Sequence, residues 1–252
     1  VWMSISRGGV TAHGDVPFSS GHLVLDAAEL AERRAELGLA GYSRLHSLQR
    51  ADVGVSLQAL ADTIESLHSQ GFPPVFIFMY DQVWLLLLQL FDLVAVMLGS
   101  SEIEMSLAVF AWALQSGISG QRVGSNFGQP HRDKKYSDCH TAERKLSMMT
   151  TWLPLVPVTL RNGCMYVLPA ELDPLLENTN DPLHMKPDED VVRPLCEPQP
   201  CDAGDVLAWQ ANLIHWGAAC SEDLEEQPRK SIATAFMLAG IGKLNSMETI
   251  TK

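Results

Sequence analysis

The first hundred residues carry apolar positions with the period of an α-helix. Residues 24–39 and 56–71 place apolar side chains three and four positions apart. Asp26 stands near the start of the first segment, and glycines stand near the ends of both segments (Gly41 and Gly71). These segments predict two amphipathic helices, so we expect the N-terminal part of the chain to be mainly helical.

A third segment, "VWLLLLQLFDLVAVML" over residues 83–98, is the longest apolar run of the chain. It is interrupted by Gln89 and Asp92. A membrane-spanning helix needs about 20 consecutive apolar residues. The shorter, interrupted run therefore predicts a helix buried in the protein core, and no membrane span is expected.

After Gly99 the pattern changes to short apolar runs of the length of β-strands. Turn residues such as Asn162-Gly163 and Ala203-Gly204 separate them. Many short strands at such spacing are typical of a sandwich or barrel. We therefore expect a mainly β protein with flanking helices, a double-stranded β-helix (jelly roll, cupin-like) beside an N-terminal helical layer. The strand-like runs are residues 104–115, 147–156, 164–169, 205–210, 212–217 and 231–240.

The length of 252 residues fits one domain. Within a single domain over 1–252, we expect residues 1–103 to form a mainly helical N-terminal part, with a Gly-, Ser- and His-rich lid or loop over 1–22. Residues 104–242 would form the jelly-roll core. The Pro- and acid-rich stretch 173–204 would be a loop that covers one mouth of the barrel.

The composition limits the binding partners and the cellular compartment that we expect for this protein. The net charge of −12 disfavours a nucleic-acid partner, because phosphate binding requires a basic surface. The five cysteines are odd in number and irregularly spaced, which favours reduced thiols in an intracellular, cytoplasmic protein. A targeting segment could have been removed, since the chain does not begin with Met. The oligomeric state is not predicted.

Two His-x-Asp motifs in the sequence are candidate metal-binding sites. His131 and Asp133 follow a Gly-rich turn, and in an extended segment their side chains project to the same side. With His215 in the later run "NLIHWG", they would form a two-histidine, one-carboxylate set. Such a set suits Fe(II) that must also bind a co-substrate and O₂. The other motif, His13-Gly14-Asp15, has no strand beside it and is a poor metal site.

A carboxylate clamp is predicted downstream in "EQPRKSIATAF". Arg229 and Ser231 share one face of the expected strand, and Lys230 should face away. A guanidinium and a hydroxyl together suit a carboxylate. The alternative is that Arg229 forms a salt bridge with Glu225 or Glu226 at the rim.

Several segments, in order, resemble the phytanoyl-CoA dioxygenase-like family of Fe(II)/2-oxoglutarate oxygenases. They are "PHRD", "TTWLPLVPVTLRNGCMYVLP", "AGDVLAWQANLIHWG" and "RKS", and the resemblance covers roughly residues 105–240. It implies that His131, Asp133 and His215 are the catalytic iron ligands. It also implies that Arg229 and Ser231 hold the far carboxylate of 2-oxoglutarate and that Trp152 lines the co-substrate pocket. The chain has "LPAELDP" where the family usually has "LPGSH".

The implied reaction is a dioxygenase reaction that hydroxylates an unactivated C–H bond of a small-molecule substrate, with release of succinate and CO₂. Desaturation and ring closure by the same oxidant remain open, as does the identity of the substrate. Two other classes are considered. One is a non-oxidative, metal-dependent cupin-type isomerase or lyase, which would not need Arg229. The other is a non-catalytic jelly-roll binding module.

Other residues near these motifs have two interpretations each. His140 could support the metal site or lie in a solvated loop, and the second is favoured. Trp209 and Trp216 are expected to pack the barrel. A cluster of basic residues could form a collar for an anionic substrate or a solvated face, and the second is again favoured. Its members are Arg122, Arg132, Lys134, Lys135, Arg144 and Lys145.

Overall fold

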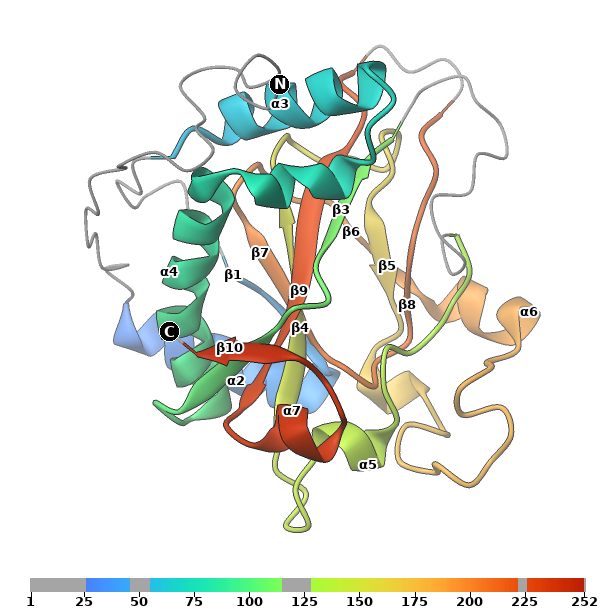
Figure 1. The fold of residues 1–252 in the computed structure, drawn as a ribbon. Coiled ribbons are helices and arrows are strands. Elements are labelled where there is room, and N and C mark those ends of the chain that lie inside the picture. Colours follow the sequence, from blue (N-terminus) through green and yellow to red (C-terminus); the bar gives the residue numbers. More distant parts are fainter. Residues whose placement is uncertain (1–25, 46–54, 115–127, 222–225, 252) are drawn as a thin grey trace.

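Two antiparallel β-sheets face each other, with helices on the outer side of the larger one (Figure 1). The computed structural model describes residues 26–45, 55–114, 128–221 and 226–251. In the larger sheet the strand order is β1 (Tyr42–Leu45), β7 (Val206–Gln210), β4 (Met148–Pro154), β9 (Lys230–Leu238), β2 (Ile103–Ser106) and β10 (Thr249–Thr251), and β3 (Phe110–Ala113) also pairs with β9. The smaller sheet has the order β6 (Glu197–Gln199), β5 (Met165–Val167) and β8 (His215–Gly217).

The predicted mainly β class with flanking helices is confirmed, and each strand-like run contains a strand. The run 104–115 differs from the expectation because it holds two strands, β2 and β3. Between them the Ser106 hydroxyl accepts a hydrogen bond from the Ala108 amide at 3.0 Å. Such a local bond offers the backbone a turn instead of a ladder, so the strand ends there. The short strands β1, β6 and β10 were not predicted.

The N-terminal helices end and begin where their capping residues indicate. Asp26 accepts hydrogen bonds from the amides of Ala28 and Glu29 at the start of α2 (Ala27–Ala40). Gly41 closes the same helix in the left-handed region with φ of 82°. Next come α3 (Leu57–Ser69), the 3₁₀ helix η1 (Pro74–Met79) and α4 (Asp81–Leu98).

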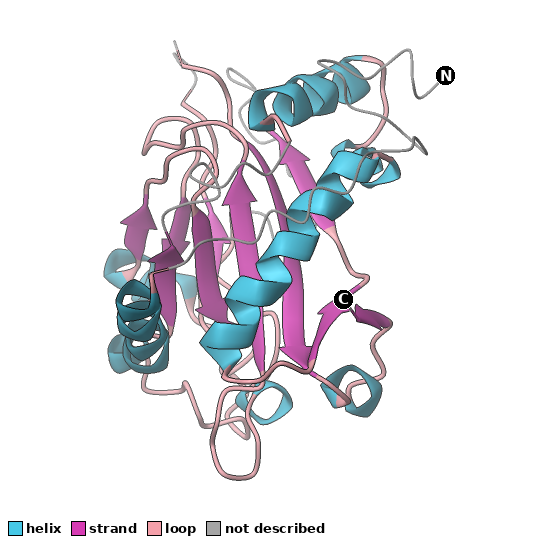
Figure 2. Cartoon of the chain, turned by 90° about the vertical axis from the view of Figure 1, so that its left-hand side faces the viewer, coloured by secondary structure: helices cyan, strands magenta, loops and turns pink. Residues whose placement is uncertain are grey.

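The helix α4 crosses the outer face of the larger sheet, where it contacts β2 and β9 (Figure 2). By length and composition it could cross a membrane, but 56% of it is buried inside the protein. Leu86, Leu90 and Val94 are buried, and Phe91 meets Phe236 of β9 edge-on with ring centroids 5.1 Å apart. This packing agrees with the predicted core helix.

Strand β4 shows how the sheet separates core from cavity. Met149 and Leu153 belong to the apolar cluster under the helices. Met148, Thr150 and Trp152 alternate with them and line a cavity on the other face. All seven residues of β4 are buried, because both faces of the sheet are covered. One wall of the cavity therefore comes from a buried central strand.

The stretch 173–204 has more regular structure than the loop expected there. Its segments are short because prolines interrupt them. Strand β6 pairs with β5 as an edge strand, where Pro198 is tolerated. Asp188 caps the short helix α6 (Glu189–Val192) by accepting a hydrogen bond from the Asp190 amide.

Other short helices among the described residues are α5 (Tyr136–Cys139), η2 (Ala170–Leu172), η3 (Arg193–Leu195) and α7 (Ile241–Leu244).

Candidate metal centre and carboxylate pocket

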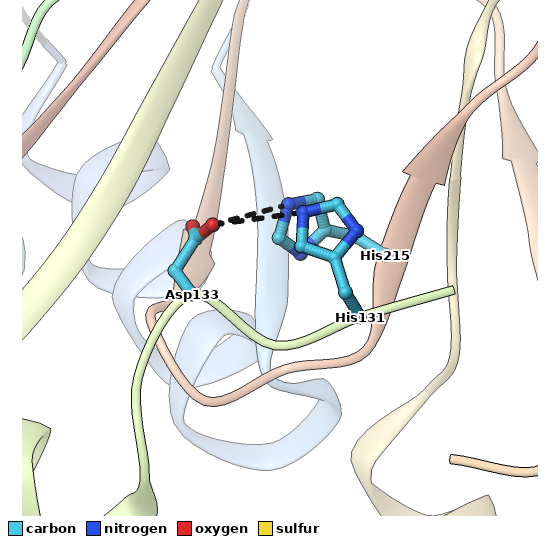
Figure 3. Close-up of side chains that lie close together, drawn as sticks. All are labelled: His131, Asp133 and His215. Carbon is cyan, nitrogen blue, oxygen red and sulfur yellow. Dashed lines mark ion pairs between the residues drawn. The ribbon is translucent and has the colours of Figure 1, made fainter. Parts of the chain in front are cut away.

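The structure brings His131 and Asp133, which lie in a loop before α5, together with His215 at the start of β8 (Figure 3). One potential ligand atom from each residue lies within 4.8 Å of the others. Asp133 Oδ1 lies 3.8 Å from His131 Nε2 and 3.6 Å from His215 Nε2. The cause is a backbone bridge, since His131 and His215 exchange amide-to-carbonyl hydrogen bonds of 3.1 and 3.0 Å.

Both imidazoles are held so that the same nitrogen faces the shared point. His131 Nδ1 lies 2.8 Å from the Gln129 carbonyl, and His215 Nδ1 lies 3.1 Å from the Leu213 carbonyl. A carbonyl only accepts, so each Nδ1 carries the proton and each Nε2 keeps its lone pair for a ligand. Burial lowers the pKa of His215, with the Asp133 charge acting against that shift, so this imidazole stays neutral.

Asp133 is held by one oxygen and offers the other. Its Oδ2 accepts a hydrogen bond from the Thr150 hydroxyl at 2.8 Å and one from Trp209 Nε1 at 3.4 Å. Its Oδ1 faces the two histidines. Bonds of this kind fix the orientation of a metal-binding carboxylate. Trp209 was expected only to pack the barrel, but it also lines the cavity and contacts Asp133.

We expect Thr150→Val to raise the dissociation constant for Mn(II) about 10-fold, because the isosteric change removes the strongest bond to Asp133 Oδ2. Equilibrium dialysis measures this constant. Thr151→Val is the matched control, since the Thr151 hydroxyl donates to the Thr234 carbonyl instead, at 3.1 Å. Equal effects of the two substitutions would contradict the role of Thr150.

Arg132, between the two ligands of the motif, anchors the motif in the protein. It was counted in a cluster favoured to be solvated, but its side chain is fully buried. Its guanidinium pairs with Asp173 at 2.6 Å and donates to the carbonyls of His184 and Asn212. It thus ties the segment with the two ligand candidates to the 173–204 stretch and to the loop before β8.

Arg132→Met is expected to lower the free energy of unfolding by about 3–5 kcal/mol, because it leaves the Asp173 carboxylate buried and unpaired. Urea unfolding measures this change. Arg144→Met should leave stability nearly unchanged, since the pair of Arg144 with Glu177 is exposed. A small effect of Arg132→Met would contradict the anchoring role.

A cavity of about 460 Å³ opens beside the three candidate ligands and extends to Arg229. Arg229 is only 1% exposed, so it is buried in the cavity wall and does not lie at an exposed rim. Glu226 accepts from the Thr159 hydroxyl, and Glu225 lies outside the described residues. The Arg229 guanidinium donates to the Gly163 carbonyl and lies 5.8 Å from the ring centre of Trp152. Burial lowers its pKa to about 10, so it remains charged at neutral pH.

The absence of a side chain at Gly217 leaves space for this guanidinium. A Cβ at Gly217 would lie 3.2 Å from both terminal nitrogens of Arg229. Gly217 also lines the cavity. The "HWG" end of β8 therefore supplies a ligand candidate and, two residues later, the space for the arginine.

Residues 88–223 match the family described as Phytanoyl-CoA dioxygenase (PhyH). This match covers more than half of the chain and includes His131, Asp133 and His215. The chain belongs to the PhyH family. The resemblance found in the sequence is thereby confirmed.

Solved structures with the same fold are similar to this PhyH protein. The epimerase SnoN, crystallised with Fe³⁺, alpha ketoglutarate and nogalamycin RO, is 19% identical with a TM-score of 0.61, and the match covers 85% of each chain. The non-heme alpha ketoglutarate dependent carbocyclase SnoK from nogalamycin biosynthesis is 14% identical with a TM-score of 0.53, over 96% of this chain and 94% of that one. EctD from S. alaskensis, with 2-oxoglutarate and 5-hydroxyectoine, is 15% identical with a TM-score of 0.50, over 92% and 84%. These likenesses confirm the predicted double-stranded β-helix. A comparison with curated protein sequences found no match.

Three other residues with predicted roles in this PhyH protein differ in their position relative to the cavity. Trp152 lines the cavity, and its Nε1 has no hydrogen-bond partner among the described residues. Ser231 is buried next to Arg229 in sequence but does not line the cavity, and its hydroxyl also has no partner there. Lys230 faces the helices, as expected, and pairs with Glu65 of α3 at 2.9 Å.

Several sequence candidates lie apart from the cavity. His140 stacks on Tyr136 with ring centroids 3.8 Å apart, and its Nδ1 lies 3.3 Å from the Tyr136 carbonyl. Trp216 stacks between Tyr166 and Arg193 on the smaller sheet, in agreement with a packing role. His13, Asp15 and Arg122 lie outside the described residues.

Proposed function

We propose that this PhyH protein is an Fe(II)/2-oxoglutarate-dependent dioxygenase that oxidises a C–H bond of a small-molecule substrate. The observation that supports it most is one cavity that holds both a two-histidine, one-carboxylate cluster and a buried arginine. The cluster suits a divalent iron with open coordination positions. The arginine suits a co-substrate with a carboxylate remote from the metal.

The residues present fit the metal. His131 and His215 would bind it through Nε2, because their Nδ1 atoms already donate to carbonyls. Asp133 would bind it through Oδ1, because Oδ2 already accepts from Thr150. Fe(II) would supply the oxidation of the substrate by O₂, with 2-oxoglutarate converted to succinate and CO₂.

The residues present also fit 2-oxoglutarate. Arg229 would pair with its far carboxylate inside a buried pocket, where such a pair is weakly screened. The Nε1 atom of Trp152 is a buried donor on the same cavity wall, and a carboxylate oxygen would satisfy it. Ser231 would assist only if its side chain turned toward Arg229, since it does not line the cavity.

Hydroxylation is the proposed outcome. Asp133 occupies the carboxylate position of the cluster, so the metal would keep a full set of three protein ligands. The apolar walls around it, such as Met148, Met165 and Ala233, would keep bulk water away from the reacting C–H bond. Epimerisation and ring closure are the reactions named for two proteins of the same fold, and product analysis distinguishes them.

The test is succinate formation from 2-oxoglutarate by protein reconstituted with Fe(II) without oxygen and then exposed to air. Wild-type protein should form succinate slowly even without a substrate, and Asp133→Ala should form none. His68→Ala, a substitution on α3 away from the cavity, is the control and should match wild type. Failure of the wild type both to bind 2-oxoglutarate and to form succinate would contradict the proposal.

A further inference from the structure

The cavity has a third compartment beyond the residues assigned to the metal and the co-substrate. Along β4, Trp152, Thr150 and Met148 line the cavity in turn, at about 6.6 Å per two residues. Trp152 stands near Arg229, and Thr150 bonds the ligand candidate Asp133. Met148 therefore lies on the far side of the metal position from Arg229.

Strand register and hydrogen bonds place Lys134 in this far compartment. The Lys134 amide donates to the Ala211 carbonyl at 2.9 Å, and the Ala211 amide donates to the Met148 carbonyl at 3.4 Å. Lys134, Met148 and Ala211 all line the cavity. Met247, which packs against the apolar cluster that contains Met148 and Ala211, and Ala235, which pairs with Thr150, complete the wall. We name these five residues the distal compartment.

The distal compartment combines apolar walls with one cation. Among the described residues, no carboxylate lies within ion-pair distance of the Lys134 ammonium. In contrast, Arg132 and Arg144 of the same basic cluster pair with Asp173 and Glu177. Among the described members of the cluster, Lys134 lines the cavity and has no ion-pair partner.

Charge counting points to an anion as that ligand. In the proposed enzyme a divalent metal and Arg229 would balance Asp133 and a dicarboxylate co-substrate. The charge of Lys134, which lines this cavity, then has no opposite charge to balance it among the described residues. A charge in such surroundings is stabilised by a partner of opposite sign.

We propose that the distal compartment binds the substrate and that Lys134 selects one with an apolar body and an anionic group, such as a carboxylate. This inference rests on the proposed function. Met148, Met247 and Ala211 would contact the apolar body, and the ion pair with Lys134 would orient it toward the metal. Thioether side chains adapt to varied apolar shapes, which suits this wall.

The experiment measures binding of matched probe pairs to protein loaded with Mn(II) and 2-oxoglutarate. The probes are hexanoate, octanoate and 4-phenylbutyrate, each beside its uncharged amide. Relaxation of the probe protons in NMR gives both the affinity and the proximity to Mn(II), and Zn(II)-loaded protein is the diamagnetic control. Binding of Mn(II) and 2-oxoglutarate is measured first, so that failure of the proposed function is recognised separately from failure of this inference.

Wild-type protein should bind the best acid at least about 10-fold more tightly than its amide, as expected for a hydrogen-bonded ion pair. Lys134→Gln should remove that preference and Lys134→Arg should keep it. Lys135→Gln, at the exposed neighbouring lysine outside the cavity, should behave as wild type. Unchanged Mn(II) binding in Lys134→Gln shows that the variant is folded.

The following results would overturn the inference while leaving the proposed function intact. They are equal affinity for acids and amides, an acid preference that survives in Lys134→Gln, and no binding of any acid to the loaded wild-type protein. Loss of the preference in Lys135→Gln to the same degree would also overturn it, because a general surface charge would then explain the binding.

Discussion

His215→Ala should weaken Mn(II) binding by at least about 100-fold and bring succinate formation below detection. Loss of residues that only support a metal ligand already costs 10- to 100-fold, so loss of a ligand should cost more. His215 is also the ligand candidate with the least solvent exposure, at 4% of its side chain. Water that entered the space of the missing imidazole would not reproduce its position. Equilibrium dialysis with Mn(II) and a succinate assay measure the two effects.

Two controls separate loss of the ligand from loss of the fold. His215→Gln fills most of the space but offers an amide, so it should retain folding and still fail to bind metal tightly. His68→Ala removes a histidine from α3 and should change neither quantity. Tight Mn(II) binding by a folded His215→Ala protein would show that the metal is held elsewhere.

Arg229→Ala should raise the dissociation constant of 2-oxoglutarate by about 100-fold while Mn(II) still binds. Removal of one partner from a buried, hydrogen-bonded charge pair costs about 2–5 kcal/mol, and 100-fold corresponds to the lower part of that range. The guanidinium lines the cavity and donates to the Gly163 carbonyl, whereas Asp133 is held by Thr150 and Trp209, so the metal site should remain formed. Titration calorimetry with 2-oxoglutarate on Mn(II)-loaded protein measures the change.

Arg229→Lys should show an intermediate loss, because an ammonium keeps the charge but not the planar two-point geometry. Arg161→Ala removes an exposed arginine outside the cavity and should bind 2-oxoglutarate as wild type does. A metal-dependent isomerase or lyase would not need Arg229. Full 2-oxoglutarate binding by Arg229→Ala would therefore contradict the oxygenase proposal and favour that class.

The fold was predictable where the pattern of the sequence is local. Helices α2, α3 and α4 have clear apolar periodicity, and Asp26 and Gly41 mark the ends of α2 as capping residues do. The edge strands β1, β6 and β10 were missed because each has only three or four residues and none of them lies in an apolar run of the sequence. Strands this short are defined by their partners in the sheet rather than by their own alternation.

The candidate site was predictable at the positions that stand in motifs. The His-x-Asp spacing and the late histidine single out His131, Asp133 and His215, and the structure places them together. Their supporting residues carry no such pattern. Thr150 and Trp209 reach Asp133 only because β4 and β7 pair in a register that sets these two residues opposite each other. The pairing register of β4 and β7 could not be inferred from the sequence pattern alone.

The different surroundings of Arg132 and Lys134 also could not be predicted from the sequence. In the sequence they are neighbours in one basic cluster. In the structure Arg132 is buried against Asp173, whereas Lys134 lines the cavity. The alternation of side chains in an extended segment predicts that Arg132 points away from the metal. It does not predict that Arg132 forms an ion pair with Asp173, 41 positions downstream.

The most direct test of the account is a crystal structure of the protein prepared without oxygen in the presence of Fe(II) and 2-oxoglutarate. We expect iron to be bound by Nε2 of His131 and His215 and by Oδ1 of Asp133. The far carboxylate of 2-oxoglutarate should pair with Arg229. Iron bound by another set of residues, or 2-oxoglutarate bound away from Arg229, would contradict it.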